Sequence, residues 1–235
     1  MDRALAVIPA RGGSKRIPRK NIKDFRGKPL IVYSIQAALD CGLFGRVIVS
    51  TDDDEIAAVA RQYGAEVPFV RPKELADDFA STASVIDHAV EYFENLGESY
   101  DFVCTIYATA PFIRGEFIRK GYELLKDSDA VNAFSCATMP FPIQRTFRIN
   151  GQGRAEMFHP ECFFSRSQDL EEAFQDAGQF YWTCRSRQKQ HQDAVMFSSV
   201  SIPVIIPRYL VQDIDTPEDW KRAELMFDAI QRADG

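Results

Sequence analysis

A basic segment with paired glycines lies close to the N-terminus of this chain. Residues 9–21 read PARGGSKRIPRKN, and Arg11, Lys15, Arg16, Arg19 and Lys20 place five cations within ten positions. Adjacent glycines let the backbone approach a ligand and turn its N–H groups toward an anion. The segment therefore indicates phosphate binding, with a triphosphate as the natural ligand. The alternative is a solvated basic loop, and the spacing matches neither a Walker A loop nor a dinucleotide fingerprint.

A second candidate site, Asp213-Ile214-Asp215, lies near the C-terminus. Two carboxylates at positions i and i+2 of an extended segment point the same way, so both can reach one hard cation such as Mg²⁺. Ile214 would then face the core. The alternative is an Asx turn that caps the helix predicted to begin at Thr216. The pair alone is a weak metal signal, and a phosphate-binding loop at the same sheet edge would strengthen it.

Other polar residues give less specific signals. The acidic run 52–55 follows a predicted strand, and capping of the next helix is its favoured interpretation. Asp52 could alternatively be a further polar group near a metal. The three histidines show no catalytic spacing, and there is no GxSxG motif. A covalent nucleophile is therefore not implied.

The composition is that of an ordinary globular protein. The chain has 235 residues, a formal net charge of −6 and 46% hydrophobic residues, which excludes collagen-like and disordered classes. The acidic balance argues against nucleic acid as a partner, since such affinity comes mostly from clustered Lys and Arg. No apolar run reaches the roughly 18 residues of a membrane span. Five widely spaced cysteines are typical of reduced thiols, so we expect a cytoplasmic protein with no membrane partner.

Short apolar runs alternate with helical patterns over the first 135 residues, which predicts an α/β fold with a doubly wound, mostly parallel sheet. In such a sheet the loop after the first strand lies at the carboxyl edge, where ligands bind. The predicted strands are 4–8, 46–50, 66–70, 102–107, 130–136 and 201–207. The predicted helices are 29–42, 53–63, 82–96, 116–125 and 216–232.

This alternation breaks between about 137 and 185. The stretch is rich in Phe and Pro, and it alternates in short pieces at 145–149 and 154–157. We interpret it as an insertion within a single domain that spans 1–235, with a hairpin arm over 137–170. Aromatic residues outside a regular core mark either an interface or a local hydrophobic cluster, and periodicity does not separate the two.

Four ordered segments resemble the sugar-acid cytidylyltransferases, over nearly the whole chain. They are Ile8–Arg16 with Lys20-Asn21, Val49–Asp52, Arg71–Ala76 and Asp213–Thr216. The resemblance implies a Rossmann-like nucleotidyltransferase that makes a CMP-nonulosonic acid. The anomeric hydroxyl of the sugar attacks the α-phosphate of CTP, and pyrophosphate leaves. Such chemistry requires positioning and charge neutralisation more than a covalent partner.

The resemblance also implies roles for individual residues. The catalytic contacts to the triphosphate are Arg11 and Lys15, with Ser14 in the same loop. Positions near the phosphates and ribose are Lys20 and Asn21, and the cytosine-reading positions are Arg71, Ala80 and Thr82. The Mg²⁺ ligands are Asp213 and Asp215.

The sugar end departs from the sialic acid pattern. Residues 176–182 read DAGQFYW, which resembles the pseudaminic acid branch of the family. An aromatic wall suits the terminal methyl group of pseudaminic acid. Polar side chains placed to bind a hydroxyl would be left without a hydrogen-bond partner by this sugar. We expect sugar contacts from Tyr107, Gln179 and Tyr181, whereas Phe180 packs. Sialic, legionaminic and eight-carbon acids are the alternative substrates.

The family resemblance implies a homodimer in which the inserted dimerisation arm crosses to the partner. Arg166 would then pair the sugar carboxylate, in its own site or in the partner's, or remain a rim cation. A non-catalytic CTP-binding regulator on the same fold is the alternative of another class. Retention of both Asp213 and Asp215 argues against it.

Overall fold

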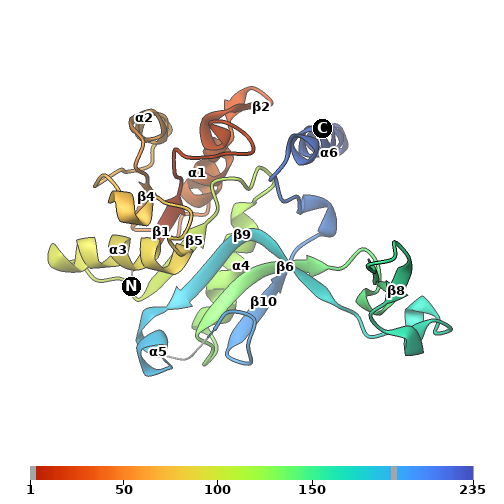
Figure 1. Cartoon of the computed structure of the whole chain (residues 1–235). Helices are drawn as coiled ribbons and strands as arrows, with labels where there is room; N and C mark the ends of the chain where they lie inside the picture. The colour runs from red at the N-terminus through yellow and green to blue at the C-terminus, as the bar shows by residue number, and fades with distance from the viewer. Residues whose placement is uncertain (1–3, 192–194, 235) are drawn as a thin grey trace.

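A six-stranded sheet forms the centre of the computed structural model, which describes residues 4–191 and 195–234 (Figure 1). The strand order is β10-β6-β9-β5-β1-β4. The strands of this sheet are β1 (Ala4–Pro9), β4 (Arg46–Ser50), β5 (Phe102–Ile106), β6 (Asn132–Thr138), β9 (Phe174–Cys184) and β10 (Ser201–Ile205). The helices are α1 (Ile31–Asp40), α2 (Asp54–Gln62), α3 (Thr82–Asn95), α4 (Gly115–Lys126), α5 (Arg185–Gln190) and α6 (Pro217–Asp234). The predicted doubly wound, mostly parallel fold is confirmed.

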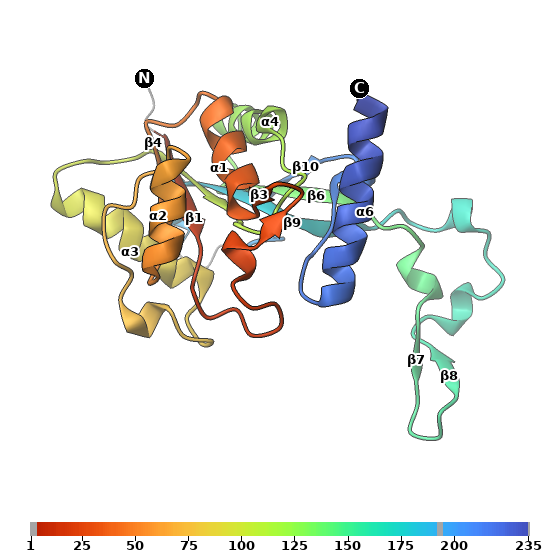
Figure 2. The same ribbon diagram turned by 90° about the horizontal axis from the view of Figure 1, so that it is seen from above.

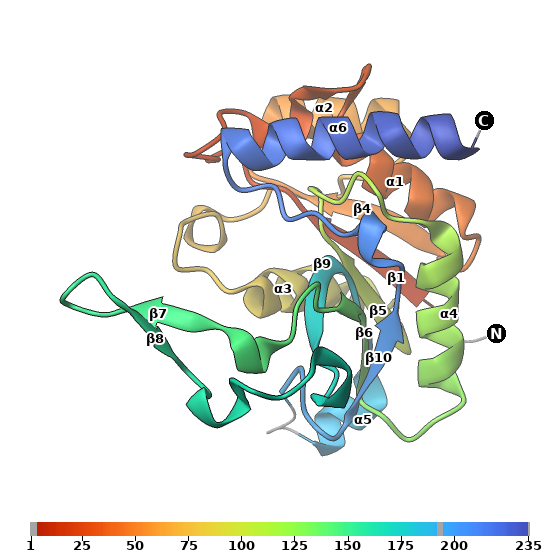
Figure 3. The ribbon, with the colours of Figure 1, turned by 90° about the vertical axis from the view of Figure 1, so that its right-hand side faces the viewer.

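Helices cover both faces of the sheet (Figure 3). Ala6 and Ile8 of β1 belong to the larger core cluster, which includes buried residues of α1, α2 and α4. Leu5 and Val7 face the other way, into a cluster with Phe93 of α3. Because neighbouring residues of β1 are buried on opposite faces, its sequence is continuously apolar, as the sequence analysis expected.

The sequence prediction was wrong for two strands. Residues 66–70 form no strand, and only Glu66 makes an isolated parallel bridge to Ile48. Conversely, the late part of the supposed insertion is β9, a central strand that pairs antiparallel with both β5 and β6. Gly178, with φ of +63°, and a register shift near Phe134 interrupt this strand. Its periodicity is therefore broken, which hid it in the sequence.

Residues 139–173 leave the sheet after β6 and return at β9 as an arm that projects from the body (Figure 2). The arm ends in a hairpin of β7 (Phe147–Ile149) and β8 (Ala155–Met157), close to the short pieces that the sequence predicted. Two short strands elsewhere, β2 (Asp24–Phe25) and β3 (Lys28–Pro29), form a small ribbon before α1. The arm carries exposed aromatic residues: Phe141, Phe147, Phe158, Phe163 and Phe164.

The C-terminal helix α6 packs over the segments that surround the N-terminal loop. Trp220 and Ala223 share a core cluster with Phe25, Leu210 and Ile214. This cluster, which also contains Ile17, fixes the segment after β10 and the start of α6 against the loop after β1. In the described part of the chain, no helix has the length and apolar character that crossing a bilayer requires.

Candidate functional site

An open cavity of about 510 Å³ lies at the carboxyl edge of the sheet. Its walls come from the loop after β1, the segment before α3, the end of β5 and the segment before α6. This is where ligands bind in doubly wound sheets. Eleven of the residues singled out in the sequence line it: Arg11, Ser14, Lys15, Arg16, Lys20, Asn21, Arg71, Ala80, Thr82, Tyr107 and Asp215.

Acidic residues after β4 hold the loop that follows β1. The N–H of Gly12 donates to Oδ1 of Asp52 at 3.0 Å. A Cβ on Gly12 would lie 2.7 Å from Oδ2 of Asp53, so glycine alone permits this approach. Arg19 binds the carboxylates of Asp53 and Glu55. The loop is thus fastened to the N-terminus of α2.

Asp53 also caps α2. Its side chain accepts hydrogen bonds from the N–H groups of Glu55 and Ile56. The hydrogen bonds with the Arg19 guanidinium lower the pKa of Asp53, and the two backbone donors act in the same direction. The capping interpretation of the acidic run is therefore confirmed for Asp53, whereas Asp52 holds the loop.

Two cations of the loop meet one carboxylate across the cavity. Asp78 pairs with Arg11 at 2.8 Å and also with Lys15. Arg11 additionally donates to the carbonyl of Asp77 at 2.8 Å. Hydrogen bonds from Lys15 and then Arg11 lower the pKa of Asp78. An anion that binds these cations would therefore compete with Asp78 for them.

Arg71 forms a buried, charged part of the cavity wall. Its side chain is held at the end of β4, where Nε donates to Oγ of Ser50 at 3.1 Å and Nη2 donates to the Ser50 carbonyl. Only 4% of its surface is exposed. Burial lowers its pKa to about 10, and the neighbouring charge of Arg11 adds to this. Arg71 is thus a rigid donor with few competing waters.

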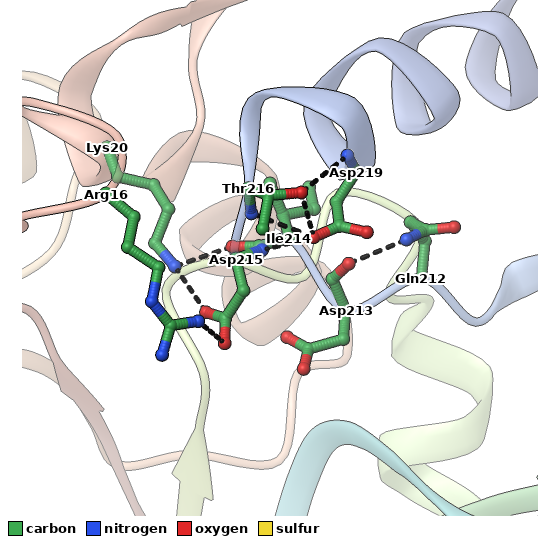
Figure 4. Close-up of polar contacts among 8 residues, drawn as sticks. All are labelled: Arg16, Lys20, Gln212, Asp213, Ile214, Asp215, Thr216 and Asp219. Atoms are coloured by element: carbon green, nitrogen blue, oxygen red, sulfur yellow. Dashed lines mark hydrogen bonds and ion pairs between the residues drawn. The ribbon is translucent and has the colours of Figure 1, made fainter. Parts of the chain in front are cut away.

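The Asp213 and Asp215 carboxylates extend to the same side of their segment (Figure 4). Asp215 pairs with Arg16 at 2.7 Å and with Lys20 at 3.3 Å. Ile214 between them is fully buried, as the sequence analysis expected. Desolvation, followed by the charge of Asp215, raises the pKa of Asp213.

The Asx-turn alternative does not describe this pair. Oδ2 of Asp219 accepts from the N–H groups of Asp215 and Thr216, and Oγ1 of Thr216 accepts from the N–H of Asp219. Thr216 and Asp219 therefore form the reciprocal cap of α6. Neither Asp213 nor Asp215 uses its carboxylate to cap α6, and of the two only Asp215 lines the cavity.

A second cavity of about 370 Å³ shares Thr82 and Tyr107 with the first. The Tyr107 and Tyr181 rings meet at 5.1 Å between centroids, and the Tyr181 hydroxyl donates to Asp176 at 2.6 Å. Burial and this contact raise the pKa of Tyr181. The apolar lining residues are Ile86, Val103, Met196 and Phe197, and polar ones include Asp87, Asn132 and Asp176.

Three sequence candidates line neither cavity: Asp213, Gln179 and Arg166. Gln179 is 3% exposed, and its amide faces Leu210 instead of a cavity. Its predicted direct contact to a sugar has no support in this placement, because a bulge in β9 turns the side chain inward. Arg166 lies exposed in the arm and pairs with Asp169 at 2.7 Å. Phe180 is fully buried, as expected.

Sequence reasoning missed Asp78 and the loop-holding role of Asp52. Both contacts join segments far apart in the chain, 63 residues for Lys15 with Asp78 and 40 for Gly12 with Asp52. The available signal was the presence of acidic runs after a predicted strand, in a chain with a strongly basic loop elsewhere. It was not used because charge pairing across a cavity has no local spacing rule.

The fold and the cationic cavity define an α/β protein with a site for an anionic ligand at the carboxyl edge of its sheet. The fold resembles solved nucleotidyltransferases. A CMP:2-keto-3-deoxy-manno-octonic acid synthetase complexed with CTP matches with a TM-score of 0.67 at 18% identity, covering 97% of this chain and 99% of that chain. A 4-diphosphocytidyl-2C-methyl-D-erythritol synthase from Anaerococcus prevotii matches with a TM-score of 0.60 at 14% identity, covering 97% and 99%. These matches show the fold.

Sequence comparison then gives the family. Residues 5–192 match the model of the cytidylyltransferase family. The pseudaminic acid cytidylyltransferase of Campylobacter jejuni is 45% identical over 223 residues, which cover 95% of each chain. The CMP-N,N'-diacetyllegionaminic acid synthase of Legionella pneumophila is 32% identical over 98% of this chain and 99% of its own. The chain belongs to the cytidylyltransferase family, whose members are CTP-dependent nucleotidyltransferases.

Proposed function

We propose that this chain is an enzyme that makes CMP-pseudaminic acid and pyrophosphate from CTP and pseudaminic acid. One observation carries the proposal: a cationic cavity and a second, partly aromatic cavity share Thr82 and Tyr107. Two substrates bound in these cavities would meet at their junction. The similarity to the Campylobacter jejuni relative over 95% of both chains supports the choice of sugar.

The nucleotide occupies the first cavity in this proposal. Arg11 and Lys15 exchange Asp78 for the triphosphate, and Ser14 lies in the same loop. Lys20 and Asn21 lie near the phosphates and ribose. Arg71, Ala80 and Thr82, which also line this cavity, bind the cytosine base.

Asp213 and Asp215 are the proposed Mg²⁺ ligands, and the donor set fits this ion. Mg²⁺ is usually held by one or two carboxylates together with substrate phosphates and waters. Among residues 4–191 and 195–234, no group of three His, Cys, Asp or Glu gathers as a complete protein cage. Arg16 and Lys20 already bring positive charge to the Asp215 carboxylate. When bound, the ion would neutralise charge on the phosphates.

The chain's own residues position the reaction. The anomeric hydroxyl oxygen of the sugar forms a bond to the α-phosphorus, and the bond from that phosphorus to the bridging oxygen of pyrophosphate breaks. The hydroxyl proton is lost, and pyrophosphate leaves with the electron pair of the broken bond. Arg11 and Lys15 balance the charge that grows on the leaving group.

The sugar occupies the second cavity. Met196 and Phe197 offer an apolar surface for the terminal methyl group of pseudaminic acid. Asp176 and Asn132 offer oxygen acceptors for the N–H of an acetamido group. A sugar with a hydroxymethyl group in place of the methyl would bury an unpaired hydroxyl there.

The arm completes a homodimer in this proposal. Its exposed Phe residues form an apolar surface that a second copy would cover. Arg166, whose ion pair among the described residues is with Asp169 of the arm, is then available to the sugar carboxylate of the partner's site. The five cysteines are free, which fits action in the reducing cytoplasm.

The test is pyrophosphate release with CTP and Mg²⁺ from pseudaminic, legionaminic, sialic and the eight-carbon acid, with and without a chelator. We expect release from pseudaminic acid and its loss on chelation. Release only from another sugar would contradict the sugar assignment and keep the reaction. CTP binding with no release from any sugar would identify a regulator instead of an enzyme.

Replacing Asp78 by asparagine is expected to tighten CTP binding by about two- to fivefold, because an exposed ion pair that competes with the triphosphate is removed. Isothermal titration with CTP measures the effect. Glu74→Gln is the matched control, since it removes one charge from the same exposed segment, and the ion pairs of Arg11 and Lys15 in the described part of the chain are with Asp78 instead. Equal tightening by both variants would show a general charge effect and contradict the displacement of Asp78.

A further inference from the structure

The segment that carries Asp213 and Asp215 is fixed chiefly at its downstream end, where the N–H of Asp215 donates to Asp219 and its carboxylate pairs with Arg16 and Lys20. It runs from the 3₁₀ turn Arg208–Leu210 to the first residue of α6, Pro217, and belongs to no strand. Within it, Ile214 is buried, and its carbonyl accepts from Nζ of Lys20 at 2.6 Å. The upstream end of the segment follows Leu210, so the position of Leu210 sets where the segment begins.

The side chain of Gln179 makes a hydrogen bond to that upstream end. Nε2 of Gln179 donates to the carbonyl of Leu210 at 2.6 Å. Both residues are buried, with 3% and 1% of their surfaces exposed. The other amide atom, Oε1, has no hydrogen-bond partner in the described part of the chain. The Leu210 contact is therefore the interaction that this buried side chain makes.

The register shift between β6 and β9 directs the side chain of Gln179 toward the Leu210 carbonyl. Gly178 has φ of +63°, and its N–H donates to Oδ1 of Asp176 at 2.9 Å. Oγ of Ser135 in β6 accepts from the N–H groups of Gln179 and Phe180, at 3.3 and 3.2 Å. Bulges next to active sites commonly redirect one side chain. Here the redirected side chain leaves the sheet and meets the segment after β10.

The same residue also fixes the junction of the two cavities. The carbonyl of Gln179 accepts from the N–H of Tyr107 at 2.9 Å. Tyr107 lines both cavities. One residue of β9 thus contacts the wall between the cavities through its backbone and the Asp213–Asp215 segment through its side chain.

We propose that Gln179 is a positioning residue that sets the Asp213–Asp215 segment for the metal. This rests on the proposed function, in which these two carboxylates are the metal ligands. Without the Gln179 donor, the buried Leu210 carbonyl is unpaired, and the upstream end of the segment is held more loosely, by the packing of Leu210 with Ile214 and Trp220. Metal binding then includes the cost of ordering the segment, and metal affinity falls.

The test compares Gln179→Met with the wild type. Methionine keeps the length of the side chain and removes the donor. Binding of Mn²⁺ to the enzyme with CTP and no sugar is followed by electron paramagnetic resonance, and amide hydrogen exchange is followed over 211–216. We expect Mn²⁺ affinity to fall about tenfold, the loss expected from one buried hydrogen bond. We also expect faster exchange of these amides and unchanged CTP affinity without metal.

Ser135→Ala is the matched control, because it removes buried hydrogen bonds from the same bulge without touching Leu210. An equal loss of Mn²⁺ affinity in both variants would overturn the proposal in favour of general loosening. Gln179→Asn, whose amide is too short to reach Leu210, gives the same comparison if the methionine variant folds poorly. Unchanged Mn²⁺ affinity in the Gln179 variants, with pyrophosphate release intact in the wild type, would overturn this inference alone. Absence of Mn²⁺ binding by the wild type would overturn both proposals.

Discussion

Substitution of Asp215 by asparagine is expected to lower kcat by about 10²- to 10³-fold with little loss of folding stability, the size of effect seen when one strong charge-stabilising group is removed. The substitution keeps the shape of the side chain and removes the negative charge that meets Arg16 and Lys20. If Asp215 is a metal ligand, the ion loses a charged oxygen next to the reacting phosphates.

The fold should survive this change because other groups hold the segment. Thr216 and Asp219 form the cap of α6, and Ile214 stays buried. Steady-state kinetics at saturating Mg²⁺ and a thermal melt are the measurements. Glu218→Gln, at an exposed position in the first turn of α6, is the control for charge. Turnover at the wild-type level in Asp215→Asn would remove Asp215 from the metal site.

Replacing Lys15 by methionine is expected to lower kcat/KM for CTP by about 10²-fold, the effect of losing one cation that meets charge in the transition state. Lys15 is exposed and its only ion pair in the described part of the chain is with Asp78. The loop itself is fixed through Gly12 and Arg19, so it should keep its conformation in the variant.

The matched control for Lys15 is Lys120→Met, an exposed lysine on α4 that lines neither of the two described cavities. Kinetics with CTP as the varied substrate, at several salt concentrations, measure the difference. A Lys15 variant that matches the control would contradict the assignment of the loop after β1 to the triphosphate.

Much of the site could be predicted because it depends on local rules. A buried strand followed by glycines and cations indicates an anion site wherever that strand ends, and Arg11, Lys15 and Lys20 do line the cavity. The alternation of polar and apolar residues in Asp213-Ile214-Asp215 likewise predicted the burial of Ile214 correctly. These inferences need only the period of an extended chain and the chemistry of the side chains.

The remainder depends on contacts between distant segments. Strand β9 is antiparallel in a sheet that is otherwise parallel, and its bulge breaks the alternation by which a strand is recognised. Gln179 lies in that bulge, so its side chain direction could not be read from strand periodicity. The strand predicted for residues 66–70 was wrong for the opposite reason. The run is apolar enough for a strand, but only Glu66 pairs with the sheet.

The way the arm is attached has a consequence for how such enzymes can diversify. The chain leaves the sheet at Thr138 and returns at Phe174, and these two residues are paired neighbours in the β6–β9 ladder. The excursion is therefore a long hairpin whose stem is already closed by sheet hydrogen bonds. Its outer part can be lengthened, shortened or exchanged without rerouting the central strands. If the arm makes the subunit contacts, as proposed above, those contacts can vary by exchange of one module while the nucleotide cavity stays unchanged.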